Sequence, residues 1–367
     1  MKLMFDRNDL VNGLSTVIKA IPQHTTMPVL ECIFIEAKDN SIVAKAFDME
    51  LGISTHISGE IIEEGQAAID AKMFLNVASK MPDGEVLLSI NENFTCTIKS
   101  GKIKFDIQCR NAEDFPEIPE VYGETDVVMS QYTLKEIIRQ TIFSVADDKM
   151  AGNKVMTGEL FEVSGDSLKV TSLDGHRIAI RKTDLRNSYN PVSAIIPGKT
   201  LTEISKILSG DVNDDVTLSF TKLHVCFTFG MTTVVSRTID GQFFDIEKMI
   251  QMPHDTTVTV NKRDLIGCID RALVLVKEGD RKPLVMETQD GFLSLSMKST
   301  IGQMDETLDG VVDGKPIKIG MNPKFVIDVL KVVDEEEITI YLSGAKNPCI
   351  IKDEGSYLYL VLPVAMK

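Results

Sequence analysis

The segment Asp174-Gly175-His176-Arg177 places a carboxylic acid, an imidazole and a guanidinium beside a predicted strand. A hydrolase could use such groups to move a proton and to stabilise developing negative charge. Such an enzyme also needs a nucleophile or a metal. The sequence has no Gly-x-Ser-x-Gly motif, no paired metal-binding carboxylate motif and no phosphate-binding glycine loop. We therefore expect no catalytic site, and a hydrolase using Asp174–Arg177 stays open as an alternative.

The other histidines and the cysteines do not form a metal-binding pattern. Zinc ligands usually occur at short, regular spacings, and this chain has no Cys-x-x-Cys pair. The residues concerned are His24, His56, His224 and His254, and Cys32, Cys96, Cys109, Cys226, Cys268 and Cys349. We expect buried free thiols, no metal and no cofactor.

Composition favours a folded protein that does not enter a membrane. Of the 367 residues, 43% are hydrophobic and 25% are charged, which is typical of globular chains. The apolar run Leu358–Val364 is far shorter than a membrane-spanning helix. Because Lys2, Asp6 and Arg7 precede any apolar run long enough for a secretory signal, we expect the protein in the cytoplasm.

Three similar segments along the chain supply the elements that must position these side chains. Each begins with apolar residues spaced along one helix face. The three faces are Leu10, Leu14, Val17, Ile18 and Ile21; then Leu134, Ile137, Ile138 and Ile142; then Leu265, Ile269, Leu273 and Val276. Thr133 with Glu136 and Asn261 with Asp264 predict two of the helix starts.

Two strand pairs and a second short helix follow in each segment. The first strand pairs are 30–35 with 41–46, 160–163 with 167–171, and 285–288 with 292–297; the second are 86–90 with 94–99, 216–220 with 224–229, and 338–342 with 349–352. The short helices begin near Lys72, Lys199 and Lys324. We therefore predict an α+β chain of three repeated domains with antiparallel sheets, at 1–126, 127–253 and 254–367.

Positive charge is concentrated in the predicted helices. The six helical windows, 7–21, 71–80, 134–145, 198–208, 261–277 and 323–332, are each net positive and together carry +8, whereas the whole chain carries −15. A negative chain does not adhere to nucleic acid uniformly, so any contact must be local. Basic helices could line a ring that holds duplex DNA without reading its bases. The open alternative is an interaction scaffold that never touches nucleic acid.

The chain resembles the bacterial DNA sliding clamps, the beta subunits of DNA polymerase III. The resemblance runs from end to end and rests on the order of several short motifs within the threefold repeat. These are Leu173–Ala179, Asp114-Phe115-Pro116, Asp240–Phe243, Asn322-Pro323-Lys324 and Tyr359–Val364. It implies three clamp domains per subunit, sheets outside and helices inside, in a ring-shaped head-to-tail homodimer. It also implies a processivity factor of DNA replication rather than an enzyme.

The resemblance further implies a groove for partner peptides between the second and third domains. Its residues would be Met156, Leu173, Gly175, His176, Arg177, Ile178, Lys248, Met249, Val361, Leu362, Pro363, Val364 and Ala365. Leu173, Asn153, Phe244 and Ala365 depart from the usual family residues, so we expect a shifted motif preference. Implied partners are the polymerase III catalytic subunit, the clamp loader, and other polymerases and repair proteins.

Two further sets of residues complete the expectation. The family pattern places Phe105 and Ile107 opposite Val274 and Leu275 at the dimer joint. Duplex DNA, bound without sequence preference, is expected to contact basic residues on the helices and nearby loops. These are His24, Lys72, Lys80, Arg139, Lys149, Lys154, Lys199, Lys206, Lys262, Arg271, Lys324 and Lys331.

Overall fold

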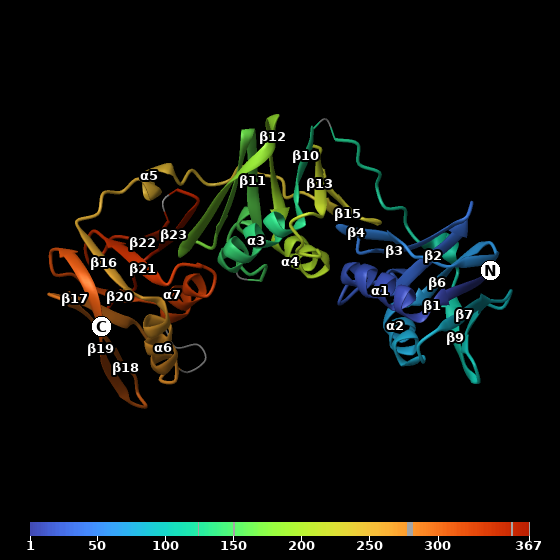
Figure 1. Ribbon diagram of the computed structural model, residues 1–367, viewed down its shortest axis with the longest axis horizontal. Helices are drawn as coiled ribbons and strands as arrows, with labels where there is room; N and C mark the ends of the chain where they lie inside the picture. The colour runs from blue at the N-terminus through green and yellow to red at the C-terminus, as the bar shows by residue number, and fades with distance from the viewer. Residues whose placement is uncertain (124, 150, 277–281, 354, 367) are drawn as a thin grey trace. The chain divides into compact units, whose positions relative to one another are not determined.

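A computed structural model describes residues 1–123, 125–149, 151–276, 282–353 and 355–366. The chain forms two compact units (Figure 1). Unit 1 comprises Met1–Lys135 and Lys199–Thr238, and unit 2 comprises Glu136–Gly198 and Ile239–Lys367. Each unit is built around one antiparallel sheet.

Unit 1 contains a sheet of 13 strands within the described residues. The strands are β1 (Lys2–Asp6), β2 (Cys32–Lys38), β3 (Ser41–Phe47), β4 (Leu51–His56), β5 (Glu60–Glu63), β6 (Gly65–Asp70), β7 (Glu85–Ile90), β8 (Thr95–Ser100), β9 (Ile103–Arg110), β10 (Thr125–Ser130), β13 (Asp215–Phe220), β14 (His224–Phe229) and β15 (Thr232–Arg237). They lie in the order β10-β13-β14-β15-β4-β3-β2-β6-β9-β8-β7-β1-β5.

Unit 2 contains a sheet of ten strands within the described residues. The strands are β11 (Gly158–Leu173), β12 (Arg177–Pro197), β16 (Thr256–Asn261), β17 (Leu284–Gln289), β18 (Phe292–Lys298), β19 (Gln303–Gly314), β20 (Lys318–Met321), β21 (Glu337–Leu342), β22 (Cys349–Lys352) and β23 (Tyr357–Val361). Their order is β11-β12-β23-β22-β21-β16-β19-β18-β17-β20.

Each sheet is continuous because strands far apart in sequence pair edge to edge. In unit 1, β4 pairs with β15, and the Thr55 and Thr232 hydroxyls lie 2.8 Å apart across this seam. In unit 2, β12 pairs with β23 from Arg177↔Val361 to Arg181↔Tyr357. Pairing satisfies backbone groups that a free edge would expose. Strands of the predicted middle domain are therefore shared between both sheets.

Each of the six predicted helical windows contains an α-helix, although residue 277 of the window 261–277 lies outside the described residues. The α-helices are α1 (Arg7–Val17), α2 (Ala71–Lys80), α3 (Gln131–Thr141), α4 (Gly198–Ile207), α5 (Glu247–Ile250), α6 (Lys262–Leu273) and α7 (Pro323–Leu330). The 3₁₀ segments are η1 (Ile18–Ala20), η2 (Pro28–Glu31), η3 (Ala112–Asp114), η4 (Ile142–Ser144) and η5 (Lys154–Thr157). In the part of the chain described, no helix has both the length and the apolar character needed to cross a membrane.

One predicted helix start is right and one is wrong. Asn261 caps α6 by accepting the backbone N–H groups of Arg263 and Asp264, at 2.9 and 3.3 Å. Helix α3 instead begins at Gln131, before the predicted start at Thr133. Its cap is Ser130, whose hydroxyl accepts the Thr133 N–H at 3.1 Å. Ser is as good a cap as Thr, so residue type alone did not decide between them.

Five of the six predicted strand pairs are present as hairpins. The prediction of 160–163 with 167–171 is wrong: both stretches lie in β11, and they pair with 192–195 and 180–184 of β12 instead of with each other. Asp39, Asn40 and Gly291 have positive φ angles of 51°, 62° and 82° at the expected turns, and Gly165 has a φ angle of 62° within β11. Asn, Asp and Gly tolerate this geometry better than other residues. At Gly165, β11 changes register against β12: 158–163 pair with 192–197, and 167–173 pair with 178–184. The six cysteines are free and buried, as predicted.

Glu159 is an acidic side chain in the interior of unit 2. It is fully buried near the start of β11, and among the described residues neither carboxyl oxygen has a hydrogen-bond partner, since the nearby Thr141 hydroxyl donates to the Ile137 carbonyl at 2.7 Å. Burial raises the pKa of the Glu159 carboxyl to about 8, because removal from water disfavours the charged form. The carboxyl is therefore mostly protonated at neutral pH.

We expect Glu159→Gln to remove one component of the pH dependence of stability. A carboxyl with a raised folded-state pKa stabilises the folded protein fully below its unfolded pKa of 4.5, and this stability is lost as pH rises towards 8. The loss should total about 5 kcal/mol, from 1.36 kcal/mol per pKa unit. Urea unfolding at several pH values from 4 to 9 gives the free energy of unfolding of the wild type and of the variant, and the change of their difference with pH measures this loss. A constant difference would contradict it.

Candidate functional site

In the turn between β11 and β12, Asp174 and Gly175 are required by the backbone geometry of the turn. One Asp174 carboxylate oxygen accepts the backbone N–H groups of His176 and Arg177, at 2.9 and 3.1 Å. Gly175 has φ +84°, a conformation that L side chains rarely adopt. The other Asp174 oxygen accepts a bond from Arg177 Nε at 2.9 Å. Asp174 thus shapes the turn and is already occupied by bonds within it.

The corresponding turn of unit 1 uses the same acid in the same way. Asp48 accepts the backbone N–H groups of Glu50 and Leu51, at 3.0 and 2.6 Å. Met49 adopts a positive φ of 75°. The aspartate therefore has a structural role in both turns, and the two turns differ at the positions of Gly175, His176 and Arg177.

A groove of about 200 Å³ lies beside the Asp174–Arg177 turn in unit 2. Four segments form it: η5 with Met156, the turn with its flanking strands, the stretch 244–249, and the end of β23 with Leu362. The lining residues are Met156, Leu173, Gly175, His176, Arg177, Ile178, Phe244, Asp245, Ile246, Met249, Leu360 and Leu362. Behind the groove, a buried cluster of Leu173, Ile178, Ile180, Ile246, Ile350 and Leu360 supports its floor.

The structure brings eight of the predicted groove residues together. They are Met156, Leu173, Gly175, His176, Arg177, Ile178, Met249 and Leu362. Lys248, Pro363, Val364 and Ala365 lie next to lining residues in the sequence and do not line the groove themselves. Val361 does not line it either, because its side chain is buried in the main core of unit 2.

Four lining residues were not among the predicted groove residues: Leu360, Phe244, Asp245 and Ile246. Of these, Phe244 was named only as a departure from the family pattern. Leu360 could have been found from strand alternation, because side chains two residues apart share a face. Leu358, Leu360 and Leu362 pack on the cluster behind the groove, whereas Tyr357, Tyr359 and Val361 belong to the main core. The apolar run before α5 was the available signal for Phe244 and Ile246. Their approach to β11 depends on tertiary packing.

The C-terminal residues are held against the turn by backbone hydrogen bonds. The Leu362 N–H donates to the His176 carbonyl at 2.8 Å, and the Val364 N–H donates to the Gly320 carbonyl at 2.8 Å. A Cβ atom at Gly320 would lie 2.7 Å from the Val364 carbonyl oxygen. The tail is therefore a fixed wall of the site.

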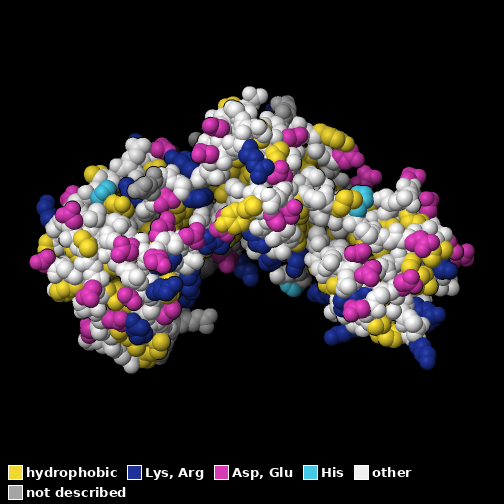
Figure 2. Space-filling view, viewed as in Figure 1, with side chains coloured by type: hydrophobic (Ala, Val, Ile, Leu, Met, Phe, Trp, Pro, Cys, Tyr) yellow, Lys and Arg dark blue, Asp and Glu magenta, His cyan; other side chains and the backbone are white. Residues whose placement is uncertain are grey.

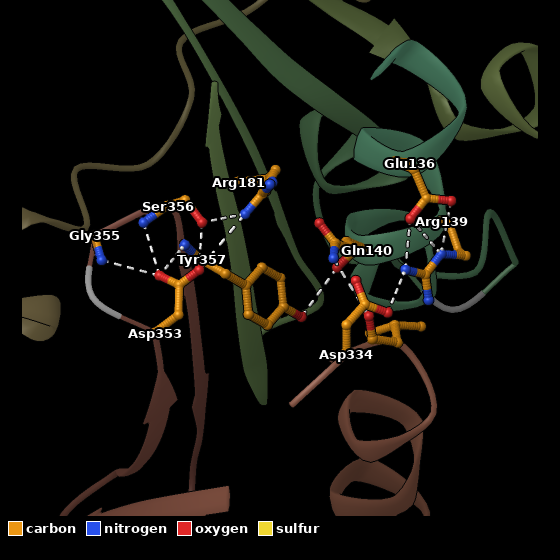
Figure 3. Close-up of polar contacts among 10 residues, drawn as sticks. Glu136, Arg139, Gln140, Arg181, Asp334, Asp353, Gly355, Ser356 and Tyr357 are labelled. Atoms are coloured by element: carbon orange, nitrogen blue, oxygen red, sulfur yellow. Dashed lines mark hydrogen bonds and ion pairs between the residues drawn. The ribbon is translucent and has the colours of Figure 1, made fainter. Parts of the chain in front are cut away.

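The predicted DNA-contacting residues fall into two groups. Five of them already bind protein groups: Arg139 pairs with Glu136 and Asp334, Lys199 with Asp48, Lys206 with Glu203, Arg271 with Glu306, and Lys262 donates to the Val333 carbonyl. Figure 3 shows Arg139 between its two acids. Figure 2 shows blue Lys and Arg side chains gathered near α6, among acidic ones.

The second group is available for contacts with a ligand. Within the described residues, the side chains of His24, Lys72, Lys80, Lys149, Lys154, Lys324 and Lys331 are exposed and take part in no ion pair. An unpaired lysine binds phosphate without first breaking an internal bond. We therefore rank this group above the paired one as DNA contacts.

The four predicted interface residues differ in exposure. Val274 is 76% exposed and Phe105 is 42% exposed. Ile107 is half-buried in β9, and Leu275 packs partly against the main core of unit 2. Among the described residues, no group of three or more His, Cys, Asp and Glu side chains is placed to hold a metal ion.

Comparison with known proteins covers nearly the whole chain. Models of the DNA polymerase III beta subunit match residues 1–119 with its N-terminal domain, 128–245 with its central domain and 248–365 with its C-terminal domain. The beta sliding clamp of Staphylococcus epidermidis is 32% identical over 99% of both chains.

Solved structures agree with this assignment. A crystal structure from Eubacterium rectale, assigned as a DNA polymerase III beta subunit, is 48% identical, with full coverage of both chains and a TM-score of 0.96. The DNA polymerase sliding clamp of Bacillus subtilis is 28% identical, again with full coverage, and has a TM-score of 0.95. The hydrolase and scaffold alternatives are not favoured. The chain belongs to the beta sliding clamps, the three-domain beta subunits of DNA polymerase III, which are non-catalytic processivity factors of DNA replication.

Proposed function

We propose that two copies of this chain form a head-to-tail ring around duplex DNA and that the groove of unit 2 tethers the replicative polymerase to it. The groove is the observation that carries the tethering proposal. Clamp loader, other polymerases and repair proteins would use the same groove in competition. A partner held beside the primer end acts at a high effective concentration, which makes synthesis processive. The bacterial cytoplasm is the compartment that this role requires.

The size and lining of the groove favour a peptide over a small-molecule ligand. Its volume of about 200 Å³ is below the roughly 300–1,000 Å³ of typical small-molecule sites. It suits one or two apolar side chains, such as Leu or Phe, from an extended segment. Gly175 is exposed at the rim, where its backbone groups can bond a peptide main chain, whereas the N–H and carbonyl of His176 already bond Asp174 and Leu362.

The dimer proposal rests on unpaired strand edges. In the described residues, 103–108 of β9 pair with β8 on one side only, and 303–309 of β19 pair with β18 on one side only. Free edges are templates for pairing with another chain. Phe105 lies on the first edge, in the first predicted domain, and the exposed Val274 belongs to the third. Unlike ends of two copies can therefore meet head to tail.

The defining experiment compares retention on circular and linear DNA. A closed ring should remain on nicked circular plasmid after loading and should leave linear DNA by sliding off its ends. Sedimentation should give the mass of a dimer. Equal retention on both DNA forms, or retention that depends on base sequence, would contradict enclosure.

Neutralising exposed helix lysines should weaken loading without changing sequence preference. We expect the variant K72Q/K80Q/K324Q/K331Q to load less efficiently and with a smaller salt dependence. The slope of log binding constant against log salt concentration should fall by at most about 0.9 for each lysine removed. The matched control neutralises Lys38, Lys222, Lys298 and Lys346, which are exposed outside the helices. Loading onto plasmid between 50 and 200 mM salt measures both. Similar losses in both variants would argue against a DNA role for the helices.

A further inference from the structure

Arg177 lines the groove, yet its guanidinium is directed into the protein. The side chain is only 11% exposed. Nε donates to Asp174 at 2.9 Å, one terminal nitrogen donates to Asp328 at 2.6 Å, and the other donates to the Phe143 carbonyl at 2.5 Å. The guanidinium also lies over the Phe325 ring, 4.4 Å from its centroid. Arg177 is therefore occupied by internal contacts.

Two of these contacts come from one helix, α7. Asp328 and Phe325 lie on α7, 151 and 148 positions along the chain from Arg177. Phe325 also stacks with the His176 ring, with centroids 6.0 Å apart. Asp328 is not among the residues that line the groove, and its side chain is 35% exposed. One face of α7 thus supports both specialised residues of the turn from behind.

We propose that Asp328 is a positioning residue for the peptide groove, acting through Arg177. Its carboxylate fixes the guanidinium, and the guanidinium fixes the Gly175–Arg177 turn against α7. The inference rests on the proposed peptide-binding function and adds to it a residue that does not itself line the groove. It means that α7, a helix of the third predicted domain, helps to fix the shape of the peptide groove.

The physical argument is preorganisation. Without Asp328, a terminal nitrogen of Arg177 would lose its charged partner while remaining largely shielded from water, which favours other conformations of the side chain and turn. A peptide would then bind only the fraction of molecules in the native arrangement, and its apparent dissociation constant would rise by the inverse of that fraction. Hydrogen bonds to charged groups are strong enough for a change of about tenfold.

The test measures binding of a polymerase-derived peptide with Leu and Phe anchors and no Lys or Arg. A peptide without positive charge is used so that weaker binding cannot result from the loss of direct electrostatic attraction between the peptide and Asp328. We expect Asp328→Asn to weaken binding about tenfold and Asp328→Glu, which keeps the carboxylate, to recover most of it. The matched control is Asp334→Asn. Asp334 pairs with Arg139 instead (Figure 3), so its variant should bind as the wild type does.

A double-mutant cycle separates positioning from general destabilisation. In the background of Arg177→Met, we expect Asp328→Asn to cause no further loss, since effects transmitted through one residue are not additive. An additive loss, or wild-type affinity of Asp328→Asn, would overturn the inference. If the wild type itself fails to bind the peptide while forming dimers on DNA, the tethering proposal falls and this inference falls with it.

Discussion

Deletion of residues 362–367 is expected to abolish binding of a polymerase-derived peptide while leaving the dimer intact. Leu362 is a lining residue, and its N–H holds the tail against the His176 carbonyl. The deletion removes Leu362, the lining residue of this segment, together with the backbone bonds of Leu362 and Val364 that hold the tail in place. Loss of a buried anchor site of this kind typically weakens binding by about 100-fold or more. Polymerase stimulation and productive engagement of the clamp loader should be lost as well.

The measurement is peptide affinity of the intact and truncated proteins, with dimer mass determined for both. A shorter deletion, of residues 366–367, keeps Leu362 and Val364 with their backbone bonds and should bind normally. Equal affinity of the 362–367 deletion and the intact chain would remove the tail from the site. The Asp48–Leu51 turn is not expected to substitute, because Met49 and Glu50 replace Gly175 and His176 there.

Replacing both Val274 and Leu275 with aspartate is expected to convert the dimer into monomers. Val274 is a large apolar side chain left 76% exposed, and a charge at an apolar joint must be buried without a partner. Breaking such a joint costs several kcal/mol, which is enough to shift a dimer to monomers at micromolar concentration. Sedimentation equilibrium measures the mass directly. A dimer mass for the double variant would exclude both residues from the interface.

Two controls distinguish this effect from loss of folding. Leu275 packs partly against the main core, so the single variant Val274→Asp tests the exposed side chain alone. Val311 is 71% exposed on β19, in a stretch that already pairs with β16. Val311→Asp therefore adds the same charge to a similar valine outside the proposed joint, and it should remain dimeric.

Much of the fold could be predicted because it depends on local patterns. The apolar spacing of Leu265, Ile269 and Leu273 identified α6, and Asn261 identified its start. The alternation in 30–35 and 41–46 identified a hairpin, which turns at Asp39 and Asn40. For the groove, the family motif Leu173–Ile178 identified the turn, since Asp174 and Gly175 have roles that their own neighbours require. These features involve residues a few positions apart.

Other features depended on contacts that no local pattern contains. Val361 was predicted to line the groove and Leu360 was not. Strand alternation places Leu360 and Leu362 on one face of β23 and Val361 on the other, but which of the two faces meets the groove depends on tertiary packing. Arg139 was assigned to DNA on charge alone, yet it pairs with Asp334, 195 residues away. Charge identifies a side chain's capacity to bind and does not identify its partner.

The sequence by itself determined the repeat, the helices, most of the hairpins and the family, because each is encoded by residue types at short spacing or by the order of motifs. Only the tertiary structure decided how β4 joins β15 and how β12 joins β23, and hence which strands share a sheet. It also decided that Arg177 is held by Asp328. Such contacts join residues separated by more than 100 positions, and they form because burial and hydrogen bonding favour one arrangement of the whole chain.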